Sequence, residues 1–150
     1  MTAQRRIHGK PIVYRRAVAS GSLRLSPKGR TAIRKQQVDK GDPIQAGEIA
    51  GLQAMKRTSE LIPHCHVVPL TGSRIDLRLN SEGVHVQAEA ETVGRTGVEM
   101  EALVGATVAL LTVWDMVKYV EKNRRGLYPQ TSLGPVRVEV KEKRSVRSER

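Results

Sequence analysis

Two stretches in the middle of the chain alternate apolar and polar residues with a period of two, the pattern of a strand with one buried face. Residues 73–80 place Ile, Leu and Leu between Arg, Asp and Arg, and residues 83–91 place Val and Ala between His, Gln and Glu. The connection Asn80-Ser81-Glu82-Gly83 has the composition of a hairpin turn. Residues 14–25 and 134–140 predict two further strands. The pattern therefore indicates an antiparallel sheet with one apolar and one charged face.

Three other stretches predict helices. Ser26-Pro27 and Asp42-Pro43 each combine a capping side chain with a proline in the first turn, and they predict helices over residues 27–37 and 44–59. The second of these is rich in Gly and Ala, which predicts close packing on the sheet. A long helical pattern covers residues 98–120. The order of strand, two helices, hairpin, helix and strand indicates an α+β fold with helices on one face of an antiparallel sheet.

Length and composition predict one domain over residues 13–140, with a basic arm before it (1–12) and a charged tail after it (141–150) that we expect to be disordered. There is no Phe and one Trp, so the core is aliphatic. The single cysteine excludes an internal disulfide and fits a reducing compartment. The sequence shows no signal peptide and no uninterrupted apolar run of membrane-spanning length. We expect a cytoplasmic protein that does not enter a membrane.

The formal net charge of +11 predicts a polyanionic partner, which could be nucleic acid, a nucleotide or an acidic surface. The predicted strands lack the aromatic residues on which single-strand nucleic-acid readers stack bases. Their polar faces also mix acids with cations. A nucleic-acid partner is therefore the less favoured interpretation.

The start of the predicted helix 98–120 carries candidate binding groups. Gly94-Arg95-Thr96-Gly97 leads into the helix, and the free N–H groups of a helix N-terminus can bind an anion. Glu99 and Glu101 are two residues apart and point about 200° apart, so we expect only one of them to face a site. Acids in a first turn can also serve only to complement the helix dipole.

The end of the same helix carries Asp115 and Lys118, which are three residues apart and share a face. They are either a surface ion pair or a proton-transfer pair. In the second case the lysine pKa would be lowered by its apolar surroundings. At roughly 1.5 Å per residue they lie about 24 to 28 Å along the axis from Glu99. If both ends are functional, a neighbouring subunit must complete the site.

His64-Cys65-His66 brings two imidazoles and a thiol together, but no second pair of ligands follows at zinc-binding spacing. A histidine that hydrogen-bonds a substrate or carries a proton is the favoured interpretation. Lys40 and Lys56-Arg57 stand beside predicted helix ends, where they are either solvated or available to a polyphosphate. We expect no metal and no cofactor.

Five blocks of sequence then occur in the order found in one family: KGD at 40–42, IAGLQAMKRTSELIPHCH at 49–66, TGVEMEAL at 96–103, T-x-WDMxK at 112–118 and GPVRVE at 134–139. Over roughly residues 7–140 the chain resembles the molybdenum cofactor biosynthesis protein C family, the cyclic pyranopterin monophosphate synthases. The resemblance implies a lyase that converts cyclic dihydro-GTP into cyclic pyranopterin monophosphate and pyrophosphate. It also implies a ferredoxin-like fold and a homohexamer of three dimers, with the site at a subunit interface.

The same resemblance implies roles for individual residues. Lys40, Asp115 and Lys118 match catalytic positions, with Asp115 and Lys118 expected to transfer protons and Lys40 to act at the pterin-forming or phosphate end. The substrate-binding candidates are Arg15, Lys56, Cys65, His66, Glu99, Met100 and Glu101. Arg15 matches a phosphate-binding arginine. The chain departs from the family at its start, where Arg6-Ile7-His8 replaces the usual acid and serine. A catalytically impaired relative is the remaining alternative.

Overall fold

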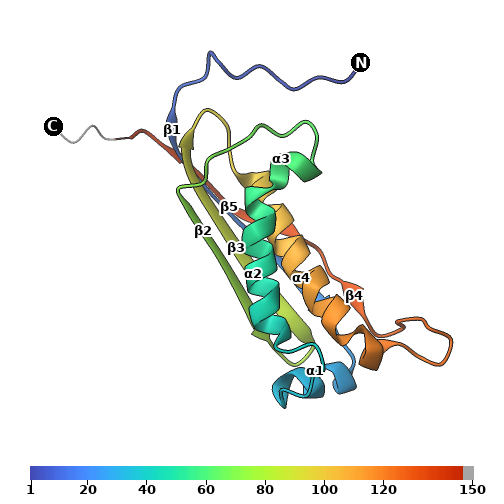
Figure 1. Ribbon diagram of the computed structural model, residues 1–150. Coiled ribbons are helices and arrows are strands. Elements are labelled where there is room, and N and C mark those ends of the chain that lie inside the picture. The colour runs from blue at the N-terminus through green and yellow to red at the C-terminus, as the bar shows by residue number, and fades with distance from the viewer. Residues whose placement is uncertain (147–150) are drawn as a thin grey trace.

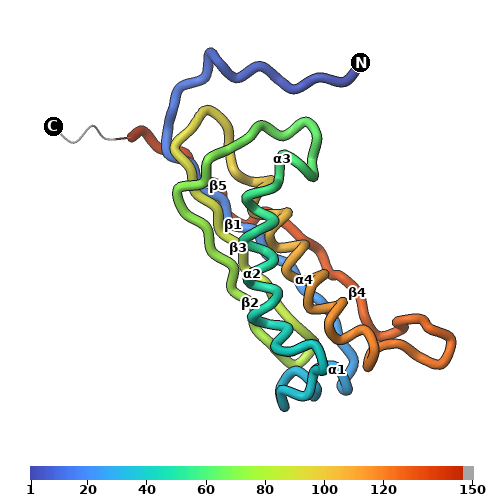
Figure 2. The backbone as a smooth tube through the Cα atoms, viewed as in Figure 1, coloured from blue at the N-terminus to red at the C-terminus, as the bar shows by residue number. Residues whose placement is uncertain are grey.

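The computed structural model describes residues 1–146, which form a five-stranded sheet and four helices (Figure 1). In chain order the elements are β1 (Val13–Arg24), α1 (Pro27–Arg34), α2 (Pro43–Lys56), α3 (Thr58–Leu61), β2 (Gly72–Leu79), β3 (Gly83–Gly94), α4 (Glu99–Glu121), β4 (Ser132–Leu133) and β5 (Arg137–Arg144). Figures 1 and 2 show α2 and α4 side by side along one face of the sheet. The predicted α+β, ferredoxin-like class is confirmed.

The sheet is antiparallel throughout and is centred on β1 and β3. Its order is β2-β3-β1-β4, and β5 pairs with β1 beside β4. Ala17 lies opposite Ala90 and Ala19 lies opposite Ala88, and all four side chains are at most 1% exposed. Because these inward-facing side chains are small, α4 can lie close against the middle of the sheet.

The glycines of α2 mark where this helix approaches its neighbours. A Cβ atom on Gly51 would lie 2.9 Å from the carbonyl oxygen of Gly105 on α4, and one on Gly47 would lie 2.5 Å from the Leu77 side chain on β2. The stripe of small residues therefore allows close packing on the sheet, as predicted. It also allows close packing on α4, which the sequence pattern did not reveal.

Helix α4 is the central element of the core. It is long enough, and its mean hydropathy of 1.5 is high enough, to satisfy the length and composition criteria of a membrane span. However, 56% of that apolar window is buried within the domain, where α4 packs against the sheet and against α2. Ala102, Ala106, Leu110, Val113 and Val117 are each fully buried and recur at helical spacing. The apolar character of α4 is accounted for by its place in the core.

The first two helices end earlier than predicted. Helix α1 ends at Arg34, because Gln36 adopts a φ of 54°, which a right-handed helix does not allow. Helix α2 ends at Lys56, and the single turn α3 follows after Arg57. The loop after α1 carries Lys40, and the early end of α1 makes this loop longer than predicted.

The last strand lies further along the chain than the predicted 134–140. β5 begins at Arg137 and continues to Arg144, so residues 141–144, assigned to the tail by sequence, pair with β1. Two contacts hold this extension. Arg16 donates to Glu142 at 3.0 Å, and the Arg144 guanidinium lies 4.2 Å above the centre of the Tyr14 ring. Of the predicted tail, residues 147–150 lie outside the described part of the chain.

Candidate active site

Three of the predicted catalytic residues meet at the C-terminal end of α4. The Asp115 carboxylate lies between two ammonium groups: Lys118 Nζ is 2.7 Å from Oδ1 and Lys40 Nζ is 2.8 Å from Oδ2. Asp115 and Lys118 share a face of the helix, as the three-residue spacing predicts. Lys40 arrives from a segment 75 residues away. The result is a Lys–Asp–Lys cluster with a net positive charge.

Local sequence explains how Lys40 is presented. Ser26 caps α1 by accepting from the N–H of Gly29, and Asp42 caps α2 by accepting from the N–H groups of Ile44 and Gln45. The two caps fix both helices, and the loop between the helices carries Lys40 to Asp115 on α4. The side chains of the three clustered residues are 48 to 54% exposed.

The electrostatics of this cluster differ from one expectation. The pKa of Lys118 is raised, because its ammonium donates to the Asp115 carboxylate, and an apolar environment does not lower it. The proposed lowered lysine pKa is therefore wrong for the single chain, since the Lys118 side chain lies at the surface. Hydrogen bonds from Lys118 and Lys40 lower the pKa of Asp115 to about 2. At neutral pH the aspartate is ionised and Lys118 holds its proton.

A second group of predicted residues gathers at the other end of α4. Cys65, His66, Glu99, Met100 and Glu101 all line one cavity of about 240 Å³. The segment after α3 supplies the cysteine and the histidine, and the first turn of α4 supplies the other three. The sequence motif 64–66 and the start of α4 therefore line one cavity.

Both glutamates of the first turn face this cavity, so the expectation that only one would do so is wrong. The Glu99 side chain folds back over the helix N-terminus, and its carboxylate would lie within 2.0 Å of a Cβ atom on Gly97. A first-turn side chain that bends this way does not follow the radial direction on which the 200° argument depends. The lack of a side chain at Gly97 makes this conformation possible.

The two carboxylates have opposite environments. Burial acts to raise the pKa of Glu99, but Lys141 Nζ lies 2.6 Å from Oε1 and this hydrogen bond, with a backbone N–H, lowers the pKa overall. Glu101 is 4% exposed, and burial, assisted by the negative charge of Glu99, raises its pKa. Burial and Glu101 also raise the pKa of the Cys65 thiol. A carboxyl group with a raised pKa is suited to exchange a proton with a bound ligand.

The basic arm closes over this cavity. Gln4 donates to the carbonyl of Cys65 at 2.7 Å, and Arg95 donates to the carbonyls of His8 and Lys10. Figure 1 shows the arm crossing the end of the molecule near α3. Arg5 and Lys10 of the arm line the cavity. The cations of the arm are thus brought to the carboxylates and the histidine.

Two predicted cations have other surroundings. Arg15 donates to the carbonyls of Gly94 and Arg95, at 3.1 and 3.2 Å, and so supports the loop that enters α4. Arg95 holds the arm, so the cation of the proposed anion loop is already engaged. Lys56 belongs to neither cluster: it lines a separate depression with residues 68–73.

Sequence reasoning missed three groups near this cavity and named His64 only as part of the 64–66 motif. Arg5, Lys10 and His64 line the cavity, and Lys141 forms the ion pair with Glu99. The high density of cations in residues 1–16 was a signal for the first two. For Lys141 the sequence offered no signal, because its role depends on the pairing of β5 with β1.

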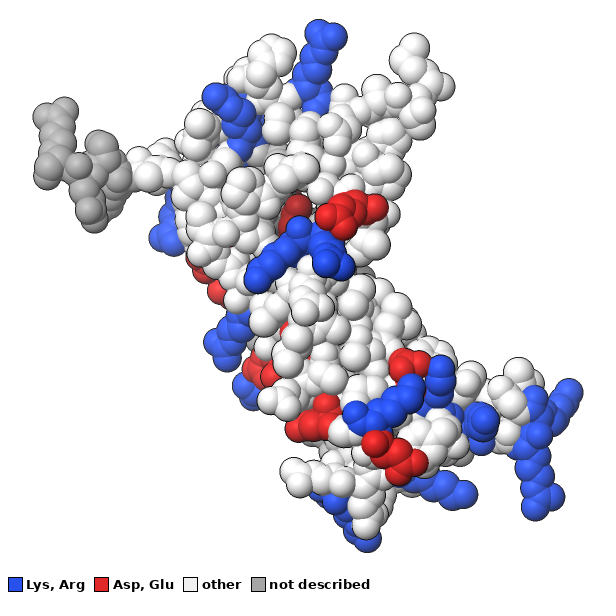
Figure 3. Space-filling model, viewed as in Figure 1, with Lys and Arg blue, Asp and Glu red and all other residues white. Residues whose placement is uncertain are grey.

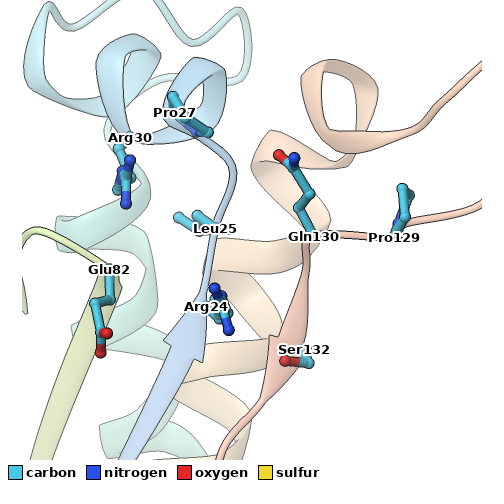
Figure 4. Close-up of a pocket in the computed structure, with 8 residues that line it drawn as sticks. All are labelled: Arg24, Leu25, Pro27, Arg30, Glu82, Pro129, Gln130 and Ser132. Atoms are coloured by element: carbon cyan, nitrogen blue, oxygen red, sulfur yellow. The ribbon is translucent and has the colours of Figure 1, made fainter.

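Among residues 1–146 no group of three His, Cys, Asp or Glu side chains is placed to hold a metal ion. A separate hollow of about 480 Å³ lies between the end of β1, the start of α1 and β4, and its rim carries Arg24, Arg30 and Glu82 (Figure 4). None of the predicted site residues lines it. Figure 3 shows Lys and Arg side chains gathered at this end of the molecule, around α1 and the C-terminal end of α4.

Fold and geometry together define a basic α+β protein whose ionisable groups form two clusters at opposite ends of one helix. The MoaC family pattern matches residues 5–144, and the chain belongs to this family. Similar proteins include a probable cyclic pyranopterin monophosphate synthase of Pyrococcus furiosus, which is 46% identical over 91% of this chain and 88% of that protein.

Two further relatives align over a similar share of the chain. A probable cyclic pyranopterin monophosphate synthase of Archaeoglobus fulgidus is 49% identical over 86% of this chain and 83% of that protein. A protein of Methanothermobacter thermautotrophicus, described as a probable cyclic pyranopterin monophosphate synthase accessory protein, is 43% identical over 91% of this chain and 86% of its own length. Nearly the whole domain is therefore shared with these relatives.

Proposed function

We propose that this protein converts cyclic dihydro-GTP into cyclic pyranopterin monophosphate and pyrophosphate, a lyase step of molybdenum cofactor biosynthesis in the cytoplasm. Family membership over residues 5–144 supports the reaction, and the names of the relatives specify the product. The single observation that carries the proposal is the cluster in which Asp115 binds both Lys40 and Lys118. These are the residues that the resemblance places at catalytic positions.

The chemistry of this reaction suits the cluster. Closing a cyclic phosphate while pyrophosphate departs builds negative charge, which positioned ammonium groups stabilise. Opening and closing heterocyclic rings also requires proton transfer. Lys118 holds its proton at neutral pH and can donate it, and Asp115 fixes the direction of that ammonium. Lys40 is then available to the phosphate or pterin-forming end of the substrate.

The second half-site suits the purine-derived end of the ligand. Glu101 is buried with a raised pKa, and His66 lies in the same cavity, so both can exchange hydrogen bonds or protons with ring nitrogens. The cations Arg5 and Lys10 of the arm add positive charge at the rim of the cavity. Groups suited to binding the substrate and groups suited to proton transfer therefore lie at both ends of α4.

We further propose that two subunits form each complete site. Sixteen residues separate Glu99 from Asp115, which corresponds to about 24 Å along a helix, too far for one small-molecule pocket. The outer faces of α2 and α4 support an assembly, because Ile49 and Leu111 are 52% and 45% exposed. A hexamer of three dimers is the assembly that the resemblance implies.

Complementation between inactive variants tests the reaction and the shared site together. Glu101→Gln and Lys118→Ala each disable a different half-site, so each homomeric variant should lose about 10² or more in kcat. Co-expressed variants should regain about one quarter of wild-type activity, because random pairing of equal amounts leaves that fraction of the sites intact. The assay incubates the protein with cyclic dihydro-GTP and follows pyrophosphate and cyclic pyranopterin.

The outcomes separate the possibilities. Absence of product from the wild-type protein would refute the reaction and favour a catalytically impaired relative. If the wild type makes product but the co-expressed variants regain no activity, the complete site lies within one chain. A nucleic-acid binder would instead show binding that weakens steeply with salt and does not depend on Lys118.

A further inference from the structure

The loop that presents Lys40 has few internal supports. Residues 35–42 connect α1 to α2, and Gln36 and Gly41 both adopt positive φ values, 54° and 102°. Within the loop the Gly41 N–H donates to Val38, and the buried Val38 side chain anchors it to the core. Lys40 itself is connected to α4 only through the tip of its side chain in the described contacts. Something must hold the loop backbone against α4 if Lys40 is to meet Asp115 reproducibly.

Tyr119 makes that connection. Its phenol oxygen accepts a hydrogen bond from the N–H of Asp39 and donates one to the carbonyl of Gln37, both at 3.3 Å. A single side-chain oxygen therefore binds the loop backbone on each side of Val38, directly before Lys40. The two bonds use both hydrogen-bonding capacities of a phenol, as donor and as acceptor.

The position of Tyr119 on α4 ties this support to the catalytic cluster. Tyr119 follows Lys118 directly and lies four residues after Asp115, one turn further along the same side of the helix. The segment of α4 that carries Asp115 and Lys118 therefore also carries Tyr119, which fixes the loop of Lys40. Any displacement of this loop along α4 changes the distance from Lys40 to Asp115.

We propose that Tyr119 is a positioning residue for Lys40. Its effect on turnover rests on the proposed function, whereas its effect on the position of Lys40 does not. Tyr119 acts through the loop, and its phenol touches none of the three clustered side chains in the described hydrogen bonds. Removing the hydroxyl leaves the ring in place and breaks its hydrogen bonds to the N–H of Asp39 and the carbonyl of Gln37, while the Gln37 N–H still donates to Ala32. Lys40 then spends less time on Asp115, and the phosphate end of the substrate loses a fixed cation.

Tyr119→Phe tests this role, with Tyr14→Phe as the matched control at the opposite end of the sheet. Loss of two hydrogen bonds to the loop should lower kcat about tenfold in Tyr119→Phe and leave thermal unfolding nearly unchanged. Tyr14→Phe keeps the ring beneath Arg144 and should match the wild type. In a Lys40→Ala background the additional effect of Tyr119→Phe on kcat should disappear, because the group that it positions is gone.

An NMR titration of the Asp115 carboxyl provides a readout that does not need turnover. Lys40 and Lys118 are the charged groups that face this carboxyl and lower its pKa. Freeing the Lys40 loop should raise the Asp115 pKa toward its ordinary value in Tyr119→Phe but not in Tyr14→Phe. The proposal is overturned if both the Asp115 pKa and kcat of Tyr119→Phe equal those of the wild type. If the wild type makes no product while the pKa still depends on Tyr119, the proposed function fails and the positioning role stands.

Discussion

The buried carboxylate of Glu121 joins three segments at the base of the Lys–Asp–Lys cluster. It accepts from the N–H of Ser26 at 3.0 Å, from the Ser26 hydroxyl at 2.8 Å and from the hydroxyl of Thr131. The Ser26 hydroxyl also accepts from the N–H of Gly29, so the same group caps α1. Glu121 therefore holds the end of α4, the start of α1 and the segment before β4 together, and it is only 6% exposed.

Replacing Glu121 with Ala should cost the fold several kilocalories per mole. The change leaves the buried Ser26 N–H without a partner, at about 1–3 kcal/mol, and removes two hydroxyl hydrogen bonds to a charged group. Two effects reduce this loss: the hydroxyls can rotate to other acceptors, and the buried charge is no longer desolvated. We expect a net loss of about 2–4 kcal/mol, which for a chain of this size lowers Tm by about 5–15 °C.

Glu121→Gln separates the hydrogen bonds from the packing. Its amide oxygen can still accept from Ser26, whereas its NH₂ group faces other donors, so we expect a loss of about 1–2 kcal/mol. Urea denaturation followed by circular dichroism gives both values, provided that the m-values agree with that of the wild type. Glu60→Ala, at an exposed position of α3, is the control and should change stability by less than about 0.5 kcal/mol. The reasoning is refuted if Glu121→Ala is as stable as this control, or if the Gln and Ala variants lose the same amount.

Two further predictions follow from the pKa shifts. Because hydrogen bonds from Lys118 and then Lys40 lower the Asp115 pKa from 3.8 to about 2, the ion pairs stabilise the fold above pH 4, and this contribution is lost as the pH falls toward 2. The difference in Tm between wild type and Asp115→Asn should therefore shrink over that range. This difference in Tm should be small throughout, because the pairs are exposed to solvent. For Cys65, burial and then Glu101 raise the thiol pKa, so Glu101→Gln should speed its alkylation by iodoacetamide at pH 8 about two- to threefold. An unchanged alkylation rate would show that the Glu101 charge does not act on the thiol.

The strands and helices were predictable where the signal is local. Alternation in residues 73–80 and 83–91 reflects a sheet with one buried face, and the observed strands β2 and β3 agree within a few residues. Ser26 and Asp42 were predicted to cap helices and do so. The end of β5 was not predictable in this way, because the charged run 141–144 becomes a strand only through partners on β1, including Arg16 and Tyr14.

For the candidate site, the sequence indicated which residues to consider better than it indicated how they are arranged. Helical spacing placed Asp115 and Lys118 on one face, but nothing local to residue 40 indicates that Lys40 would reach the same carboxylate. Only the family resemblance joined them. The direction of the Lys118 pKa was wrong because apolar neighbours in sequence, such as Met116 and Val117, turn into the core while the lysine turns to solvent.

The exposure of the Lys–Asp–Lys cluster is what we expect of one half of a site that two subunits share, as we propose. Side chains that are 48 to 54% exposed interact through water, where the attraction between charges is weak. If a neighbouring subunit covers the cluster, as we propose, the same charges lie in a less polar medium and interact more strongly. Burial would also lower the lysine pKa values and so oppose the effect of Asp115. Assembly would then complete the set of residues and also bring Lys118 closer to the pKa that proton transfer at neutral pH requires.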